Sequence, residues 1–240
     1  MPARTLGHGE IRCITFDLDD TLWATGPVID RAEQIAHTWL EKNAPAALAG
    51  RSSEELLLHR REHYATLPHY SHDFTALRRD WLETLVTAAG YERELGQRAF
   101  EVFWIARNEV EPFEDALCLL RKLQTSFTLG SITNGNADVA HIGLDALFRF
   151  SVTAADAGVM KPHPQIFSHA LGLGGIQPSA AVHVGDDPVT DVQGAKAAGM
   201  LSVWVNPDNQ PWDPAHGPGP DATIARTAQL WTVLEQWGAV

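Results

Sequence analysis

The chain places three carboxylates directly after a predicted buried strand. The mostly apolar run 11–16 has the length and composition of such a strand, and Asp17, Asp19 and Asp20 follow it at once. Like charges this close repel one another, and burial raises the cost of keeping them ionised. A fold keeps such a cluster when a cation or a reaction compensates for it. The segment therefore predicts a polar site at the end of this strand.

A second acidic cluster follows another apolar run. Residues 180–184 form the run, and Asp186, Asp187 and Asp191 come after it. Two acidic loops, each just past the carboxyl end of a strand, indicate one shared site. Clustered carboxylate oxygens are ligands for a hard divalent cation.

The segments outside the middle of the chain alternate between strands and helices. Strand-like runs occupy 11–16, 127–132, 150–153, 180–184 and 201–205, and helical patterns occupy 137–147, 164–171, 189–198 and about 227–237. This alternation predicts an α/β fold, a Rossmann-like parallel sheet core with helices on its faces. The stretch 206–220 is rich in Pro, Gly and Asp and predicts a surface loop.

The interval 27–108 has a different pattern. Its apolar residues recur at helical spacing in four successive segments, which predicts four amphipathic helices. We expect a four-helix-bundle cap at 27–108, inserted into a core made of 1–26 and 109–240. The aromatic residues Phe74, Trp81, Phe103 and Trp104 fit the bundle core, although one of them facing a substrate is an alternative.

Composition limits the classes of partner. The 240 residues carry a formal net charge of −12, which argues against binding a nucleic-acid backbone. The two cysteines, Cys13 and Cys118, are expected to be buried and reduced. The first ten residues contain no apolar signal segment, and no run approaches about 18 apolar residues. We expect a cytoplasmic protein without a membrane segment, either a monomer or a homodimer.

Polar residues follow four of the predicted strands. Asp17 and Asp19 end the first, Thr133 and Asn134 end the second, Lys161 follows the third, and the second acidic cluster ends the fourth. In an open parallel sheet, ligands bind beyond the carboxyl ends of the strands. Carboxylates for a metal, a hydroxyl, an amide and one cation are the groups that phosphoryl transfer needs.

These residues, in this order, resemble the motifs of the haloacid dehalogenase-like hydrolases, most of which are Mg²⁺-dependent phosphatases. Residues 17–21 resemble the first motif, Thr133 the second, Lys161 the third, and 185–187 with Asp191 the fourth. The amino-acid sequences of these motifs are most similar to those of bacterial phosphatases of flavin mononucleotide and of a phosphorylated riboflavin precursor. His72 and Asp73 in the cap point the same way and are expected to contact the substrate, a small phosphorylated metabolite.

The resemblance implies a role for each motif residue. Asp17 is the nucleophile that forms an aspartyl-phosphate, and Asp19 protonates the leaving group and then activates water. Thr133 and Lys161 belong to the catalytic set. They bind phosphoryl oxygens, and the backbone of Leu18 and Asp19 and the side chain of Asn134 assist.

The same resemblance implies a magnesium site. Its expected ligands are the Asp17 carboxylate, the Asp19 carbonyl and the Asp186 carboxylate. Around them, Asp187 and Asp191 are expected to orient water ligands or Lys161. Thr21 is expected to tie the catalytic loop to itself.

Each feature also has an alternative interpretation. Taken alone, Lys161 is typical of a solvated lysine at a helix start, Thr133 of a turn, and Asp191 of a helix first turn. Other functions on the same fold are a 2-haloacid dehalogenase, a phosphomutase and a non-catalytic interaction protein. A dehalogenase needs neither the metal nor the second acid, so Asp19 and Asp186 argue against it. Sugar phosphates and nucleotides are alternative substrates.

Overall fold

The structure is a computed structural model and describes residues 11–240. Residues 1–10, which the sequence prediction assigned to the core, lie outside the described part. The chain divides into two compact units. The first contains 11–24, Glu111–Asn134 and Val139–Val240, and the second contains Thr25–Val110 with Gly135–Asp138. The roles of these units as catalytic core and cap stay a prediction.

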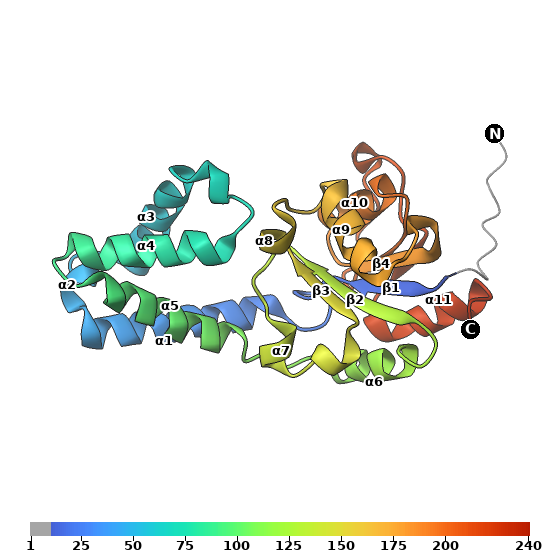
Figure 1. The fold of residues 1–240 in the computed structure, drawn as a ribbon, viewed down its shortest axis with the longest axis horizontal. Coiled ribbons are helices and arrows are strands. Elements are labelled where there is room, and N and C mark those ends of the chain that lie inside the picture. The colour runs from blue at the N-terminus through green and yellow to red at the C-terminus, as the bar shows by residue number, and fades with distance from the viewer. Residues whose placement is uncertain (1–10) are drawn as a thin grey trace. The chain divides into compact units, whose positions relative to one another are not determined.

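The first unit is built on a six-stranded parallel sheet (Figure 1). Its strands are β1 (Cys13–Phe16), β2 (Thr128–Thr133), β3 (Phe150–Thr153), β4 (Ala181–Gly185), β5 (Leu201–Val205) and β6 (Ala222–Ile224). They lie in the order β3-β2-β1-β4-β5-β6, and every neighbouring pair is parallel. The predicted α/β fold with a Rossmann-like parallel sheet is confirmed.

Helices cover both faces of this sheet. They are α6 (Glu114–Leu123), α7 (Val139–Ile142), α8 (Ala154–Ala157), α9 (Pro164–Gly174), α10 (Gly194–Ala197) and α11 (Leu230–Gln236). Helices α9 and α10 lie on one face and α6 and α11 on the other (Figure 1). Side chains of α9 pack on β2 and β3 in an apolar cluster that includes Ile166, Phe167 and Ala170. The strands of the centre are buried on both faces, which is why they are continuous apolar runs.

The elements differ from the predicted ones at several places, and the short helices α2 (Pro45–Leu48) and α8 are among the unpredicted elements. Strand β6 was not predicted, because it has three residues and only Ile224 among them is buried. The helix predicted at 137–147 is limited to α7, since Gly143 takes a φ of 83° that an α-helix excludes. The helix predicted at 189–198 begins with a π-helical turn, Pro188–Gln193, before α10.

The second unit is helical. It contains α1 (Thr25–Asn43), α2 (Pro45–Leu48), α3 (Ser53–Ala65), α4 (Phe74–Ala88) and α5 (Arg93–Arg107). Trp81 and Phe103 are buried in its core, as the spacing predicted, whereas Phe74 is exposed. The side chain of Ser52 accepts a hydrogen bond from Glu55 N, and the side chain of Glu55 accepts one from Ser52 N. This capping box fixes the start of α3.

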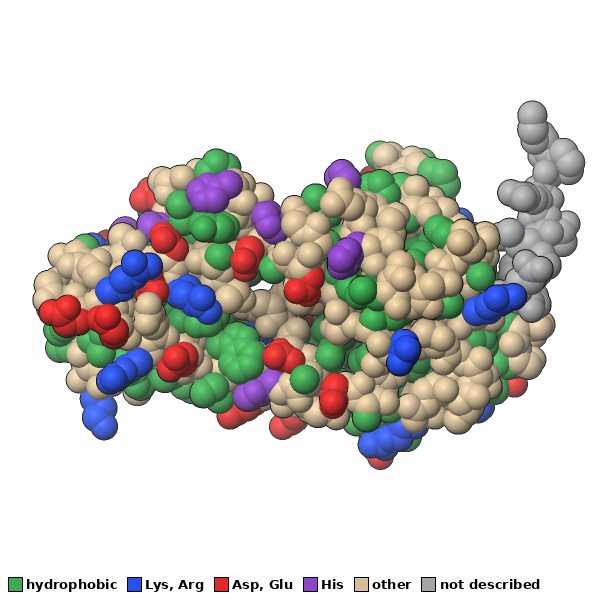
Figure 2. Space-filling view, in the orientation of Figure 1, with side chains coloured by type: hydrophobic (Ala, Val, Ile, Leu, Met, Phe, Trp, Pro, Cys, Tyr) green, Lys and Arg blue, Asp and Glu red, His purple; other side chains and the backbone are tan. Residues whose placement is uncertain are grey.

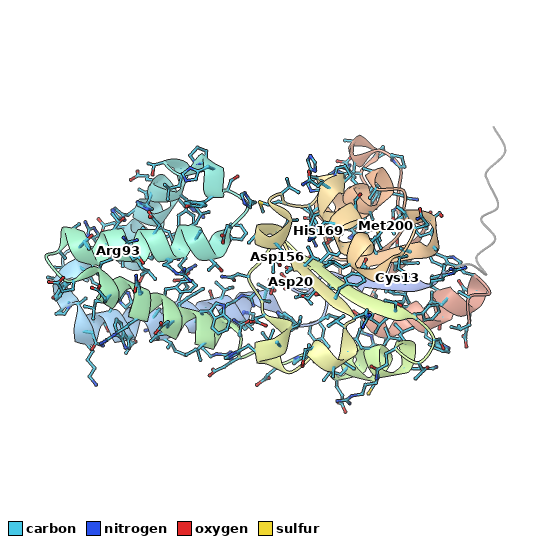
Figure 3. All side chains as sticks on the ribbon, in the orientation of Figure 1. Cys13, Asp20, Arg93, Asp156, His169 and Met200 are labelled. Carbon is cyan, nitrogen blue, oxygen red and sulfur yellow. The ribbon has the colours of Figure 1, made fainter. Side chains whose placement is uncertain are left out.

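The two cysteines differ in burial. Cys13 lies in β1 and packs in the same core cluster as Met200 (Figure 3). Cys118 is exposed on α6, so the prediction that both thiols are buried is wrong for Cys118. A cysteine in an amphipathic helix can occupy either face, and the sequence pattern did not decide which.

The charged surface is mixed. On the faces visible in Figure 2, Lys and Arg side chains of the described residues lie singly among Asp and Glu side chains. None of the helices in residues 11–240 has both the length and the apolar character needed to cross a bilayer.

Close packing of α4 on α5 generates a stability prediction. A Cβ atom at Gly96 would lie 2.5 Å from the Cα atom of Glu83, which is backbone and cannot rotate away. Arg93, the first residue of α5 (Figure 3), also binds the Glu83 carboxylate at 2.7 Å. We expect Gly96→Ala to lower the free energy of unfolding by about 1–3 kcal/mol, measured by chemical denaturation.

Gly172→Ala in α9 is the matched control, because nothing lies within 4 Å of a Cβ atom there. Helix propensity alone should make that substitution neutral or stabilising, by up to about 1 kcal/mol. Equal effects of the two substitutions would contradict the packing argument.

Candidate active site

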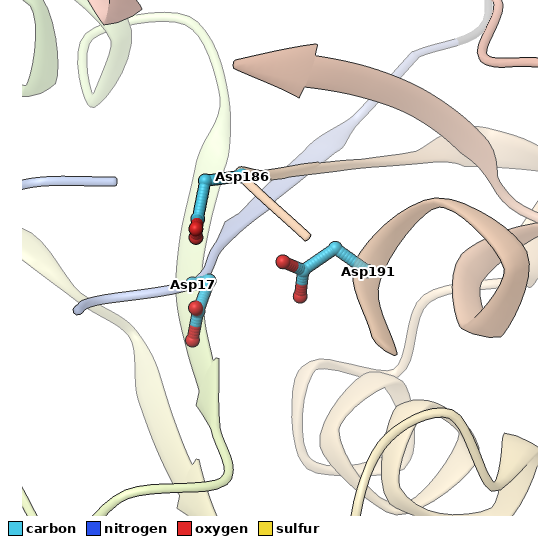
Figure 4. Close-up of side chains that lie close together, drawn as sticks. All are labelled: Asp17, Asp186 and Asp191. Carbon is cyan, nitrogen blue, oxygen red and sulfur yellow. The ribbon is translucent and has the colours of Figure 1, made fainter. Parts of the chain in front are cut away.

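Pairing of β1 with β4 brings the two acidic loops together. Phe16 lies opposite Val184, and the Asp17 N–H donates to the Val184 carbonyl at 2.8 Å, so the ladder continues into the first loop. Asp186 follows β4 on the adjacent strand. Asp191 comes from the π-helical turn and completes the group in Figure 4. One oxygen from each of these three carboxylates lies within 4.8 Å of the others.

Lys161 is the cation among these carboxylates. Its side chain is about 1% exposed, and its Nζ lies 2.8 Å from Asp17 Oδ1 and 2.6 Å from Asp191 Oδ1. Asn134 holds the backbone of this lysine, since Asn134 Oδ1 accepts from Lys161 N at 2.7 Å and Nδ2 donates to Lys161 O at 3.0 Å. The predicted phosphate-binding amide of Asn134 is therefore engaged in positioning Lys161.

Two further polar residues, missed by the sequence prediction, support Asp191. His183 Nε2 lies 3.1 Å from Asp191 Oδ1, and His183 Nδ1 lies 2.8 Å from Thr15 Oγ1. Burial lowers the pKa of His183, which favours the neutral ring. A neutral ring that donates to Asp191 through Nε2 accepts from the Thr15 hydroxyl through Nδ1. The available signal was a threonine and a histidine inside strands that are otherwise apolar.

A glycine makes room for Asp191. A Cβ atom on Gly185 would lie 2.3 Å from Asp191 Cγ, so a side chain at this position would displace the carboxylate. Asp187 N also donates to Asp191 Oδ2 at 3.0 Å. The Asp187 carboxylate itself accepts from the backbone N–H groups of Val189 and Thr190, which caps the π-helical turn.

The loop after Asp17 is held at three points. Thr21 Oγ1 donates to Asp186 Oδ1 at 3.2 Å, which joins the first loop to the second. Asp19 Oδ1 accepts a hydrogen bond from Trp23 Nε1 at 2.9 Å. The Thr21 carbonyl accepts from Thr227 Oγ1 at 2.9 Å. Asp20 is exposed and takes a φ of 57°, the left-handed conformation that lets the chain turn between these anchors.

The other predicted site residues are divided between the two units. Thr133 is the last residue of β2 and is buried, and the Leu18 side chain is fully buried in the first unit. His72 and Asp73 belong to the helical unit. Asp73 Oδ1 accepts from Ala76 N at 2.8 Å and caps α4, which gives this residue a structural role of its own.

The pKa values of the acidic residues are shifted in opposite directions, upward for Asp17 and Asp186 and downward for Asp191. Burial, and secondarily the other carboxylates, raise the pKa of Asp17 to about 8 and the pKa of Asp186 to about 7. Burial opposes ionisation of Asp191 too, but Lys161 and His183 outweigh it and hold the pKa of Asp191 below its usual range. The pKa of Lys161 is raised, because Asp17 and Asp191 outweigh burial.

The site has the character of a divalent cation site. Three carboxylates face one lysine, so the fully ionised cluster has an excess of negative charge. Asp17 Oδ1 is buried, and beyond its ion pair with Lys161 it makes no directed hydrogen bond. Carboxylate oxygens are hard ligands that suit Mg²⁺. The donor set therefore fits the ion, with Asp17 and Asp186 offering oxygens to it.

Known proteins share both the sequence and the fold. Residues 11–199 match the family profile of the haloacid dehalogenase-like hydrolases. The chain is 32% identical over 234 residues to 5-amino-6-(5-phospho-D-ribitylamino)uracil phosphatase YigB of Escherichia coli K12, covering 94% of this chain and 97% of that protein. It is 28% identical to glyceraldehyde 3-phosphate phosphatase of Methanopyrus kandleri, covering 94% of this chain and 98% of that protein.

A solved structure is similar in fold over nearly the whole chain. The crystal structure of a 2-haloacid dehalogenase from Pseudomonas syringae pv. tomato DC3000 has a TM-score of 0.88 and 42% sequence identity. The match covers 95% of this chain and 99% of that chain.

The raised pKa values of Asp17 and Asp186 generate a pH prediction. A carboxyl group in the unfolded chain ionises near its ordinary value of 3.8, whereas these two hold their protons to about pH 8 and about pH 7. Between those limits the folded protein binds more protons than the unfolded chain, so its stability falls as pH rises. We expect the Tm of the metal-free protein to fall from about pH 5 to about pH 8.

Mg²⁺ should reverse this loss, because the ion and the protons compete for the same folded carboxylates. The rise in Tm on adding saturating Mg²⁺ should be largest near pH 8 and small near pH 5, measured by scanning calorimetry. An unchanged Tm at pH 8 with saturating Mg²⁺ would contradict the site.

Proposed function

The chain belongs to the haloacid dehalogenase-like hydrolase family, and we propose that it is a Mg²⁺-dependent phosphomonoester hydrolase. One observation carries the proposal. The Asp17 carboxylate lies beside a cation, Lys161, and beside a second carboxylate, Asp186, with which it can share a metal. A nucleophile between two positive charges is the arrangement that lets a carboxylate approach a phosphate dianion.

The reaction proceeds in two steps through Asp17. In the first, an Asp17 oxygen attacks phosphorus, the bond from phosphorus to the leaving oxygen breaks, and Asp19 gives its proton to that oxygen. In the second, water attacks the phosphorus of the aspartyl-phosphate and Asp19 takes a proton from that water. The bond to Asp17 then breaks, and inorganic phosphate leaves.

The surrounding residues bind and orient the phosphoryl group. Lys161 is fixed by Asp191 and Asn134, so its charge is in place before the substrate arrives and costs no reorganisation. The Thr133 hydroxyl and the backbone of the loop after Asp17 offer donors to the phosphoryl oxygens. Asp17, the Asp19 carbonyl and Asp186 would hold Mg²⁺, which would neutralise phosphoryl charge when bound.

Dehalogenation is the second candidate, since a solved 2-haloacid dehalogenase shares 42% identity with the chain. Halide leaves as a stable anion, so displacement at carbon requires neither a proton donor nor a divalent cation. Asp19 and Asp186 have uses in phosphate ester hydrolysis and none in that reaction. A 2-haloacid is itself an anion, and without a metal it would meet three carboxylates and one lysine. The charge of the site therefore favours the phosphatase.

Two observations support a small phosphorylated metabolite as substrate. The relatives include a phosphatase of 5-amino-6-(5-phospho-D-ribitylamino)uracil and one of glyceraldehyde 3-phosphate. The first is similar to this chain over nearly the full length of both proteins, and the motif wording independently resembles phosphatases of that compound and of flavin mononucleotide. We propose 5-amino-6-(5-phospho-D-ribitylamino)uracil and flavin mononucleotide as the first substrates to test.

Replacement of the nucleophile tests the mechanism. We expect Asp17→Asn to reduce phosphate release to background, because an amide cannot form the phosphoenzyme, while circular dichroism stays that of the parent. Asp20→Asn is the matched control, since Asp20 is exposed and asparagine tolerates its φ of 57°. It should retain turnover. Turnover near the parent level in Asp17→Asn would refute the nucleophile.

Product analysis separates the two candidate reactions. Phosphate release should be measured with flavin mononucleotide, the ribitylaminouracil phosphate, glyceraldehyde 3-phosphate, nucleotides and sugar phosphates, with Mg²⁺ and with chelator. Chloride release should be measured with 2-chloropropionate under both conditions. We expect phosphate with Mg²⁺ only, and no chloride in either case. Metal-independent chloride release without phosphate would establish the dehalogenase instead.

A further inference from the structure

We propose that Trp23 is a positioning residue that orients the Asp19 carboxyl group for proton transfer to the leaving oxygen. Trp23 lies outside the motif residues and was not singled out by its sequence. The inference rests on the proposed phosphatase function, because it concerns the proton that a phosphate ester's leaving group needs. We expect hydrolysis of alkyl phosphate esters to depend on Trp23 more strongly than hydrolysis of aryl phosphate esters.

The indole is held rigidly. Trp23 is fully buried and is one of the largest fully buried side chains of residues 11–240. A backbone bridge pairs it with Asp19, so the two residues are joined through main chain and side chain. The two residues before Trp23 are also anchored. Leu22 O accepts from Phe113 N at 2.8 Å, and Thr21 O accepts from Thr227 Oγ1 at 2.9 Å. The indole N–H is therefore a fixed donor.

This donor influences where the proton of Asp19 lies. Trp23 Nε1 lies 2.9 Å from Asp19 Oδ1 and points its hydrogen at that oxygen. An indole N–H donates and cannot accept, so a proton on Oδ1 directed at Trp23 would meet another hydrogen. The carbonyl oxygen of a carboxylic acid accepts a hydrogen bond better than its hydroxyl oxygen does, so this contact favours the acidic proton on Oδ2. Trp23 thus favours one oxygen of Asp19 as the proton donor and fixes the plane of the carboxyl group.

The contribution of an oriented acid depends on the leaving group. An alkoxide is a poor leaving group and needs a proton as the ester bond breaks, whereas p-nitrophenolate leaves without one. General acid catalysis is worth about 10²–10⁴-fold in rate, and misplacement of a catalytic group by about 1 Å can cost about 10²-fold. Replacement of Trp23 should therefore lower kcat/KM most for alkyl esters.

The experiment compares kcat/KM of Trp23→Phe and the parent for flavin mononucleotide, which is an alkyl phosphate ester, and for p-nitrophenyl phosphate, with Mg²⁺. The ratio kcat/KM covers only the steps up to ester cleavage, so the shared hydrolysis of the phosphoenzyme does not enter it. We expect the loss to be about 10–100-fold larger for the alkyl ester than for the aryl ester. Equal losses for the two esters, with folding retained, would overturn the proposal.

Trp81→Phe is the matched control. It also removes a buried indole donor, from Trp81 Nε1 to His59 Nδ1 at 3.0 Å, but in the helical unit. It should leave the ratio between the two esters unchanged. β-(3-benzothienyl)alanine at position 23 provides the second variant, because it keeps the ring size and removes only the N–H. It decides the question if the smaller phenylalanine prevents folding.

A double-mutant cycle shows whether Trp23 acts through Asp19. In the Asp19→Asn background no proton remains to be oriented, so adding Trp23→Phe should leave the preference between the two esters unchanged. A further loss specific to the alkyl ester in that background would contradict the proposal. Failure of the parent to release phosphate from any of the phosphomonoesters, with Mg²⁺, would refute the proposed function itself, and the Trp23 role with it.

Discussion

The buried contact of Lys161 with Asp17 and Asp191 is the interaction on which the rest of the site depends. Two carboxylates with one ammonium between them are stable in a low-dielectric interior only when the geometry is good and the remaining lone pairs are used. Asp191 meets this condition, since Lys161, His183 and the Asp187 amide all bind its carboxylate. Asp17 does not, since beyond its ion pair with Lys161 its buried Oδ1 makes no directed hydrogen bond, and burial raises the pKa of its carboxyl group. The fold thus satisfies the Asp191 carboxylate and leaves the Asp17 carboxylate in need of a cation.

The sheet produces this difference through its strand order. With β1 and β4 adjacent and parallel, Asp17 and Asp186 come off neighbouring strand ends. Gly185 has no side chain, so the π-helical turn can bring Asp191 under them. A parallel sheet places all such ends on one edge, and residues distant in the sequence meet there without strain. The active-site chemistry is a consequence of topology as much as of the residues themselves.

The sequence was sufficient for the fold class and for the family, and both are confirmed. Five of the six strands were predicted, because central parallel strands are apolar runs. Two of the groups that support Asp191 were not predicted. His183 and Thr15 matter only because strands far apart in sequence bring them together. Asn134 was predicted to assist phosphate binding. In the structure its side-chain amide binds the backbone of Lys161, a contact that the sequence pattern did not indicate. Long-range hydrogen bonds leave no periodic trace in one sequence. The roles of the motif residues stay predictions.

Charge is what separates the two candidate reactions, phosphate ester hydrolysis and dehalogenation. Attack on carbon and attack on phosphorus can use the same buried aspartate and the same lysine, so neither residue discriminates between them. The discriminating groups are those that bring extra negative charge, because a site keeps buried carboxylates only when a cation offsets them. Asp186 lies beside Asp17 and is tied to the first loop by Thr21. A reaction that used no metal would retain this repulsion and gain nothing from it, whereas phosphate ester hydrolysis uses the cation that relieves it.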